Sequence, residues 1–116
     1  ARELLESGAR AEDADPQGRT ALMLAAMCGK TDCARTLLAH GALATAQDLR
    51  GETALIHSCR AGSAETARAL TDAGAAVDQA DYRGETPLMR ACDEGAVDCA
   101  RLLLDAGAAA ARRGRR

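Results

Sequence analysis

The stretch Asp81-Tyr82-Arg83-Gly84-Glu85-Thr86-Pro87-Leu88 decides the fold, because it recurs twice earlier in the chain at a fixed distance. Asp48–Leu55 stands 33 residues before it, and Asp15–Leu22 stands another 33 residues before that. All copies follow the pattern Asp-x-x-Gly-x-Thr-(Pro or Ala)-Leu. A period of about 20 to 50 residues is typical of stacked-repeat architectures, in which each unit packs only on its neighbours.

Each period reads as two short helices followed by an extended loop. Thr20 can accept a hydrogen bond from an amide of the first helical turn and so begin a helix. Gly29 ends that helix, and Gly41 ends a second one, since glycine adopts the left-handed conformation that terminates helices. The pattern predicts one repeat domain over residues 1–116, with a partial repeat at 1–14, full repeats at 15–47, 48–80 and 81–113, and a basic tail at 112–116.

Each predicted helix carries an apolar stripe. On the first helices the stripe recurs at positions i, i+3 and i+4, which lie on one helix face. One unit cannot bury its own stripe, so neighbouring units must stack. The residues that we expect in the core are Leu22, Ala25, Ala26, Leu55, Ser58, Cys59, Leu88, Ala91 and Cys92 from the first helices, and Ala34, Leu37, Leu38, Ala67, Leu70, Ala100, Leu103 and Leu104 from the second.

The 33-residue period, the motif Gly-x-Thr-(Pro or Ala)-Leu, the Gly between the helices and the Gly-Ala after the second resemble the ankyrin repeat over essentially the whole chain. The resemblance implies an all-α repeat fold (an α-solenoid), a stack of antiparallel helix pairs with projecting hairpin-like loops and a concave surface that binds partners. Met23, Ile56 and Met89 stand where the family usually has His. The polar link from that His to the capping Thr should therefore be missing, and packing must hold these turns.

Charge and hydropathy argue against several classes of function. The chain has 15 basic and 17 acidic residues, and four arginines fall in its last five positions, which leaves 11 basic and 17 acidic groups in residues 1–111. This net charge of −6 argues against nucleic-acid binding by the body of the chain. No apolar run approaches the roughly 18 residues of a membrane-spanning helix, which argues against membrane insertion. The sequence begins without Met and inside a repeat, so we expect it to be an excerpt of a longer protein.

Five cysteines without a Cys-x-x-Cys pair favour buried thiols in a reducing compartment. Cys59 and Cys92 lie one period apart, and Cys33 and Cys99 lie two periods apart. Equivalent positions of stacked helices are separated by about 8–10 Å or multiples of it, whereas a disulfide needs Cα atoms within about 7 Å. We therefore expect no bridge in either pair, and an intracellular location, cytoplasmic or nuclear.

Three short patterns resemble reactive sites but lack what their chemistry needs. Gly29-Lys30-Thr31 looks like the end of a phosphate-binding loop, yet Leu24 occupies the place of the first glycine of that motif. His57-Ser58-Cys59 places a base beside two nucleophiles, but neighbours on one helix point about 100° apart. His40 suits the C-terminal dipole of its helix better than a metal. We expect no catalytic residue, no cofactor and no metal.

Two sets of arginines could contact a partner. Arg2, Arg35, Arg68 and Arg101 form a column at one repeat position, and nearby acids favour a solvated outer face over a basic binding stripe. The terminal arginines in residues 112–116 fit either a solvated end or a tail for nuclear import or nucleic-acid contact.

The best candidate surface consists of positions that vary between copies, at the loop tips and beside the buried stripe of the first helices. The positions beside the stripe change from apolar in the first unit, with Leu24 and Met27, to charged in the last, with Arg90 and Asp93, which suggests a partner with an apolar end and a charged end. Tyr82, the only aromatic residue, is the natural anchor, whereas Arg90 fits equally a pairing with Asp93 and Glu94 on its own helix. The expected partner-binding residues are Gln17, Arg19, Leu24, Met27, Leu49, Arg50, Glu52, His57, Arg60, Tyr82, Arg83, Glu85, Arg90 and Asp93.

The function predicted from the sequence is that of a non-catalytic, monomeric protein–protein interaction module, which binds its partner through the loop tips and the concave first-helix surface. The alternative is a region of a larger enzyme, channel or ubiquitin-ligase adaptor that positions a substrate or partner for another domain. The identity of the partner is not written in the sequence.

Overall fold

The structure, a computed structural model, describes residues 15–107. The expected partial repeat at 1–14 and the basic tail at 112–116 lie outside these residues. Within them the chain forms three pairs of helices, one pair in each 33-residue period. The helices are α2 (Ala21–Met27), α3 (Thr31–Ala39), α4 (Ala54–Ala61), α5 (Ala64–Asp72), α6 (Pro87–Asp93) and α7 (Val97–Asp105).

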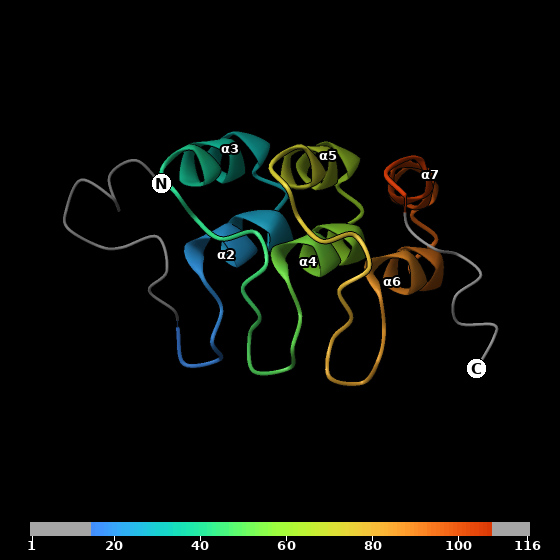
Figure 1. The fold of residues 1–116 in the computed structure, drawn as a ribbon, viewed down its shortest axis with the longest axis horizontal. Helices are drawn as coiled ribbons and strands as arrows, with labels where there is room; N and C mark the ends of the chain where they lie inside the picture. Colours follow the sequence, from blue (N-terminus) through green and yellow to red (C-terminus); the bar gives the residue numbers. More distant parts are fainter. Residues whose placement is uncertain (1–14, 108–116) are drawn as a thin grey trace.

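The helices lie in two rows that run along the molecule (Figure 1). The first helices α2, α4 and α6 make one row, and the second helices α3, α5 and α7 make the other, with neighbours in contact along and between the rows. Hairpin-like loops project from the first row on the side away from the second. This confirms the all-α repeat fold. None of the helices in residues 15–107 is long and apolar enough to cross a membrane.

Threonine begins each first helix, as the sequence predicts. The hydroxyl oxygens of Thr20, Thr53 and Thr86 accept hydrogen bonds from backbone N–H groups three residues later, at 3.3, 3.3 and 3.2 Å. The residues three positions later are Met23, Ile56 and Met89 in place of His, and the first two are buried. Met89 restores part of the missing polar link, because its sulfur accepts a hydrogen bond from the Thr86 N–H at 3.4 Å.

The aspartate that opens each copy of the repeated phrase holds its loop closed. One Asp48 oxygen, Oδ1, accepts hydrogen bonds from the backbone N–H groups of Arg50 and Glu52, both at 2.9 Å. Asp15 and Asp81 make the same two bonds in their own loops. A short acceptor side chain that bonds to the backbone just ahead is a common way to stabilise a turn. The spacing of the phrase therefore reflects the geometry of this turn.

Successive loops are joined to one another through the backbone. The Leu49 N–H donates to the Gln17 carbonyl, and the Tyr82 N–H donates to the Arg50 carbonyl, both at 3.0 Å. Tyr82 lies against Gly51, where a Cβ atom would stand 2.6 Å from the tyrosine ring and 2.7 Å from the tyrosine nitrogen. Gly51 also has a φ of +81°, so both its conformation and its contact with the next loop require glycine.

The core lies between the two rows and follows the predicted stripes, with four corrections. Cys92 and Leu104 are exposed, and Leu38 and Ala100 are only partly buried. Cys92 and Leu104 belong to α6 and α7, which no further helix pair covers within residues 15–107. Leu38 and Ala100 lie at the edge of their stripes and pack against the core from outside. The other predicted core residues are buried.

Cys59 of α4 and Cys99 of α7 form a contact that the repeat period does not predict. Both residues are fully buried. The neighbouring Cys99 thiol and the burial of the side chain raise the pKa of the Cys59 thiol. The pair joins a first helix to the second helix of the following repeat, so its members are 40 residues apart and do not follow the 33-residue spacing.

Candidate partner-binding site

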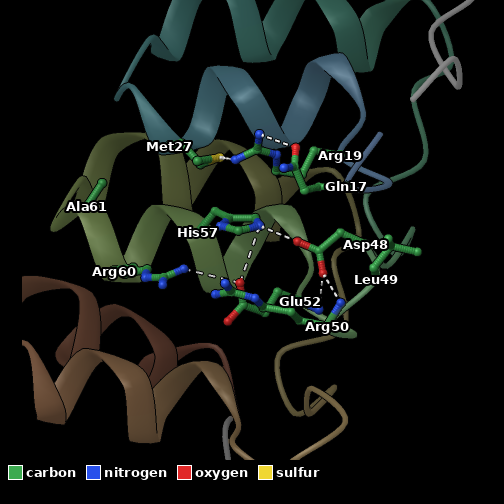
Figure 2. A pocket seen from close by; sticks show the side chains of 10 residues that line it. All are labelled: Gln17, Arg19, Met27, Asp48, Leu49, Arg50, Glu52, His57, Arg60 and Ala61. Atoms are coloured by element: carbon green, nitrogen blue, oxygen red, sulfur yellow. Dashed lines mark hydrogen bonds and ion pairs between the residues drawn. The ribbon is translucent and has the colours of Figure 1, made fainter. Parts of the chain in front are cut away.

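A pocket of about 440 Å³ lies where the first two described loops meet helices α2 and α4. We call it the loop–helix pocket. Two repeats contribute to it, each through its loop and its first helix. In each repeat, side chains of the loop lie against side chains of the helix that follows it (Figure 2). Its lining residues are Gln17, Arg19, Met27, Asp48, Leu49, Arg50, Glu52, His57, Arg60 and Ala61.

A buried polar cluster forms the inner wall of the pocket. The Nε2 atom of His57 lies 3.0 Å from Oδ2 of Asp48 and 3.7 Å from Oε1 of Glu52 (Figure 2). All three side chains are at most 5 % exposed. A carboxylate can only accept a hydrogen bond, so Nε2 carries the proton that it shares with Asp48. His57, which begins the second turn of α4, thus ties that helix to the start of its own loop.

Two arginines complete the charge balance around Glu52. Arg60, one turn further along α4, donates to Oε1 of Glu52 at 3.2 Å. Arg90 of the next repeat lies 3.9 Å from the other oxygen of Glu52 and donates to Glu85 at 2.7 Å. A buried carboxylate without such partners would be strongly destabilising. The cluster therefore links the second and third repeats as well as lining the pocket.

Asp48 remains ionised in this buried setting. Burial alone would raise its pKa, but hydrogen bonds from the Glu52 N–H, from His57 and from the Arg50 N–H outweigh that effect. The pKa of Asp48 is consequently lowered from its ordinary value of 3.8. Hydrogen bonds to the charged form of a carboxyl group always act in this direction.

Asp48, Glu52 and His57 are also the residues that could hold a metal ion, since one ligand atom from each lies within 4.8 Å of the others. A divalent cation there would have to replace the Nε2 proton of His57 and compete with Arg60 for Glu52. It would also leave Nδ1 of His57 as a protonated, buried nitrogen without a partner among residues 15–107. The chemistry of this donor set favours the internal ion-pair network over a metal.

The expected partner-binding residues separate by exposure. Leu24, Leu49, Tyr82, Gln17, Arg50, Arg83 and Asp93 are exposed, and Arg19, Met27, Arg60, Glu85 and Arg90 are partly buried. The expectation that Glu52 and His57 lie on the surface was wrong, because they are 1 % and 2 % exposed. The reason is that His57 turns inward to Asp48, and Glu52 lies beneath Arg60 and Arg90.

Among the residues that line the pocket, Asp48 was not predicted from the sequence. The sequence identifies Asp48 only as the start of a copy of the repeated phrase, whereas in the structure its second oxygen also accepts a hydrogen bond from the helix that follows. The signal that could have revealed this is the presence of His57 nine residues later, a position occupied by Leu24 and Arg90 in the other copies.

The other patterns that resemble reactive sites have structural roles. Ser58 is fully buried and its hydroxyl donates to the Leu55 carbonyl at 2.8 Å, so it does not face His57 as a nucleophile would. His40 follows α3, and its Nδ1 lies 2.9 Å from the Thr36 carbonyl in the last turn of that helix. This contact agrees with the expected interaction of His40 with the helix end.

In a comparison with known protein families, the chain matches the family of ankyrin repeats. The match contains three copies of the repeat and covers residues 1–48 and 43–113. No curated protein matches the chain. The matched residues include both loops and both helices that form the pocket.

Proposed function

This chain belongs to the ankyrin-repeat family, whose repeats generally act as protein–protein interaction modules, and we propose that it binds another protein through the loop–helix pocket and the loop tips beside it. The binding surface comprises the exposed and partly exposed members of the predicted set. Glu52 and His57 are buried and support this surface from beneath.

The observation that carries the proposal is the exposure of two large apolar side chains at successive loop tips. Leu49 is 69 % and Tyr82 is 70 % exposed. The backbone bonds between the loops hold both residues in a fixed arrangement, so a partner would meet them with little loss of conformational freedom. Aromatic residues are enriched where binding energy concentrates, and exposed apolar groups on a rigid support are typical of interaction sites.

The pocket adds shape to this surface. Leu49, Met27 and Ala61 give it apolar walls, and Arg19, Arg50 and Arg60 also line it. A concave site that combines apolar walls with a few fixed polar groups is suited to receive one side chain of a partner. The loop tips would then supply contact area, and the pocket would supply specificity.

The test is selection of a displayed library of random peptides on this chain, followed by affinity measurements with a loop-tip variant, Leu49→Ser with Tyr82→Ser. We expect the selected peptides to bind this variant at least about tenfold more weakly. A variant of the outer face, Arg35→Ser with Arg68→Ser, serves as the control and should bind like the original chain. Equal melting temperatures for the three proteins exclude a loss of folding.

Peptides that bind the loop-tip variant as tightly as the original chain would contradict the proposal. Loss of binding in the outer-face variant alone would place the site on the second helices α3 and α5 and contradict it as well.

A further inference from the structure

We propose that the loop–helix pocket recognises an acidic side chain, aspartate or glutamate, flanked by apolar residues in an extended segment of the partner. The inference rests on the proposed function and specifies the chemistry of the group that enters the pocket. It follows from which charges of the pocket face outward and which are already neutralised inside.

The acidic residues of the pocket are not available to a partner. Asp48 and Glu52 are 6 % and 1 % exposed. Both carboxylate oxygens of Asp48 accept internal hydrogen bonds. Oδ1 accepts from two backbone N–H groups, and Oδ2 accepts from His57. Glu52 is covered by Arg60 on one oxygen and approached by Arg90 on the other. A partner therefore meets little negative charge in this pocket.

The basic residues, by contrast, reach the surface from three different elements. Arg19 comes from the first described loop, Arg50 from the second and Arg60 from α4. The side chains of Arg19 and Arg60 are 27 % and 36 % exposed and each has an internal carboxylate partner. Arg50 is exposed, and its guanidinium makes no hydrogen bond or ion pair within residues 15–107. An unpaired guanidinium at the mouth of a pocket is suited to bind a carboxylate through two parallel hydrogen bonds.

The equivalent place in the next repeat carries more acidic side chains, five against four arginines, where the pocket has two acidic side chains and three arginines. Counting forward by 33 residues, Arg19, Arg60 and Ala61 become Glu52, Asp93 and Glu94. Arg83, which takes the place of Arg50, is already paired there with Glu85 at 3.2 Å. A basic pocket is thus present between the first and second described repeats and is not repeated along the stack, although residues 1–111 carry a net negative charge.

The apolar walls restrict the neighbours of the acidic residue. Leu49 and Met27 flank the arginines, and Tyr82 continues the apolar surface along the loop tips. A partner segment that places a carboxylate near Arg50 would lay its adjacent side chains against Leu49 and Tyr82. We therefore expect apolar residues on at least one side of the acid.

The experiment uses three fluorescent pools of short peptides with degenerate apolar-rich flanks and a fixed central Glu, Gln or Lys. The Kd of each pool is measured for the original chain and for Arg50→Glu. We expect the Glu pool to bind about tenfold more tightly than the Gln pool, and the Lys pool to bind most weakly. In Arg50→Glu the order should reverse, with the Lys pool binding best, because the pocket then presents a carboxylate.

Arg68→Glu is the matched control, since it makes the same change at an exposed arginine of α5, outside the pocket and outside the proposed binding surface. It should preserve the order of the pools. Equal binding of the Glu and Gln pools, or an order that Arg50→Glu leaves unchanged, would overturn the inference.

The loop-tip variant separates the two proposals. If the Glu and Gln pools bind equally and the Leu49→Ser, Tyr82→Ser variant loses both, the acidic preference is wrong and the proposed function stands. If no pool binds the original chain, or if the loop-tip variant binds all pools unchanged, both proposals are contradicted.

Discussion

Asp48 has two roles that depend on its two oxygens. Oδ1 closes the loop by accepting from two backbone N–H groups, and Oδ2 accepts from His57 on the helix that follows. Asp15 and Asp81 share only the first role, because Leu24 and Arg90 stand where His57 would be. The middle repeat is therefore the one in which the loop is fixed to its helix by a buried polar bond.

Replacement of Asp48 by Asn should destabilise the chain at neutral pH by about 1–3 kcal/mol, because His57 loses its acceptor in a buried site. The lowered pKa of Asp48 adds a pH dependence. A carboxyl group whose pKa is lower in the folded chain contributes stability above its unfolded value of 3.8, and this is lost as the pH falls through the folded-state pKa. Thermal unfolding of the original chain and of Asp48→Asn should therefore show a difference in stability that becomes smaller as the pH is lowered.

Asp15→Asn is the control, since the pKa of Asp15 is also lowered but its partner Arg19 is partly exposed. At neutral pH, Asp15→Asn should lower the free energy of unfolding by less than Asp48→Asn does. A stability difference between Asp48→Asn and the original chain that grows as the pH falls would contradict this interpretation of Asp48.

At the scale of the elements, the loops and the first helices follow different rules. The loops need glycine and aspartate at fixed positions, since a turn of this kind requires a positive φ and an acceptor side chain. The helices need only a capping threonine and an apolar stripe. The sequence predicts the position and the period of the loops. It does not predict the contacts between loops, because these contacts depend on how the repeats stack.

Gly51→Ala and Gly84→Ala distinguish the conformation within one loop from the contact between successive loops. Both glycines have positive φ, +81° and +86°, so alanine should cost roughly 1–2 kcal/mol at either position. A Cβ at Gly51 would also collide with Tyr82, whereas a Cβ at Gly84 would meet nothing within 4 Å. Chemical denaturation should therefore show a larger loss for Gly51→Ala, and equal losses would mean that the contact between the loops contributes nothing.

Leu55 tests the register of the first helices. It is fully buried in α4, so Leu55→Ala should lower the free energy of unfolding by about 2–5 kcal/mol. Leu104, which is 47 % exposed, is the matched leucine. Leu104→Ala should change the free energy of unfolding by no more than about 0.5 kcal/mol. A neutral effect of Leu55→Ala in urea denaturation would show that the stripe assigned to α4 is wrong.

At the scale of the whole molecule, the fold could be predicted because the repeat period, the caps and the stripes all indicate one architecture. The site could be predicted only in part. Exposure of Leu49 and Tyr82 follows from their position at loop tips, but burial of Glu52 depends on Arg60 and on Arg90 from the next repeat. Contacts between side chains of different repeats, such as Cys59 with Cys99, have no signature in a periodic sequence.

The most direct test of the central claim, that the partner lies on the loop tips and the loop–helix pocket, is a hydrogen-exchange footprint. The chain is compared free and saturated with a peptide from the displayed library. We predict added protection at the amides around Leu49, Arg50 and Tyr82 and at the end of α4, with none in α3 or α7. Protection confined to the second helices, with the loop tips unchanged, would contradict the account.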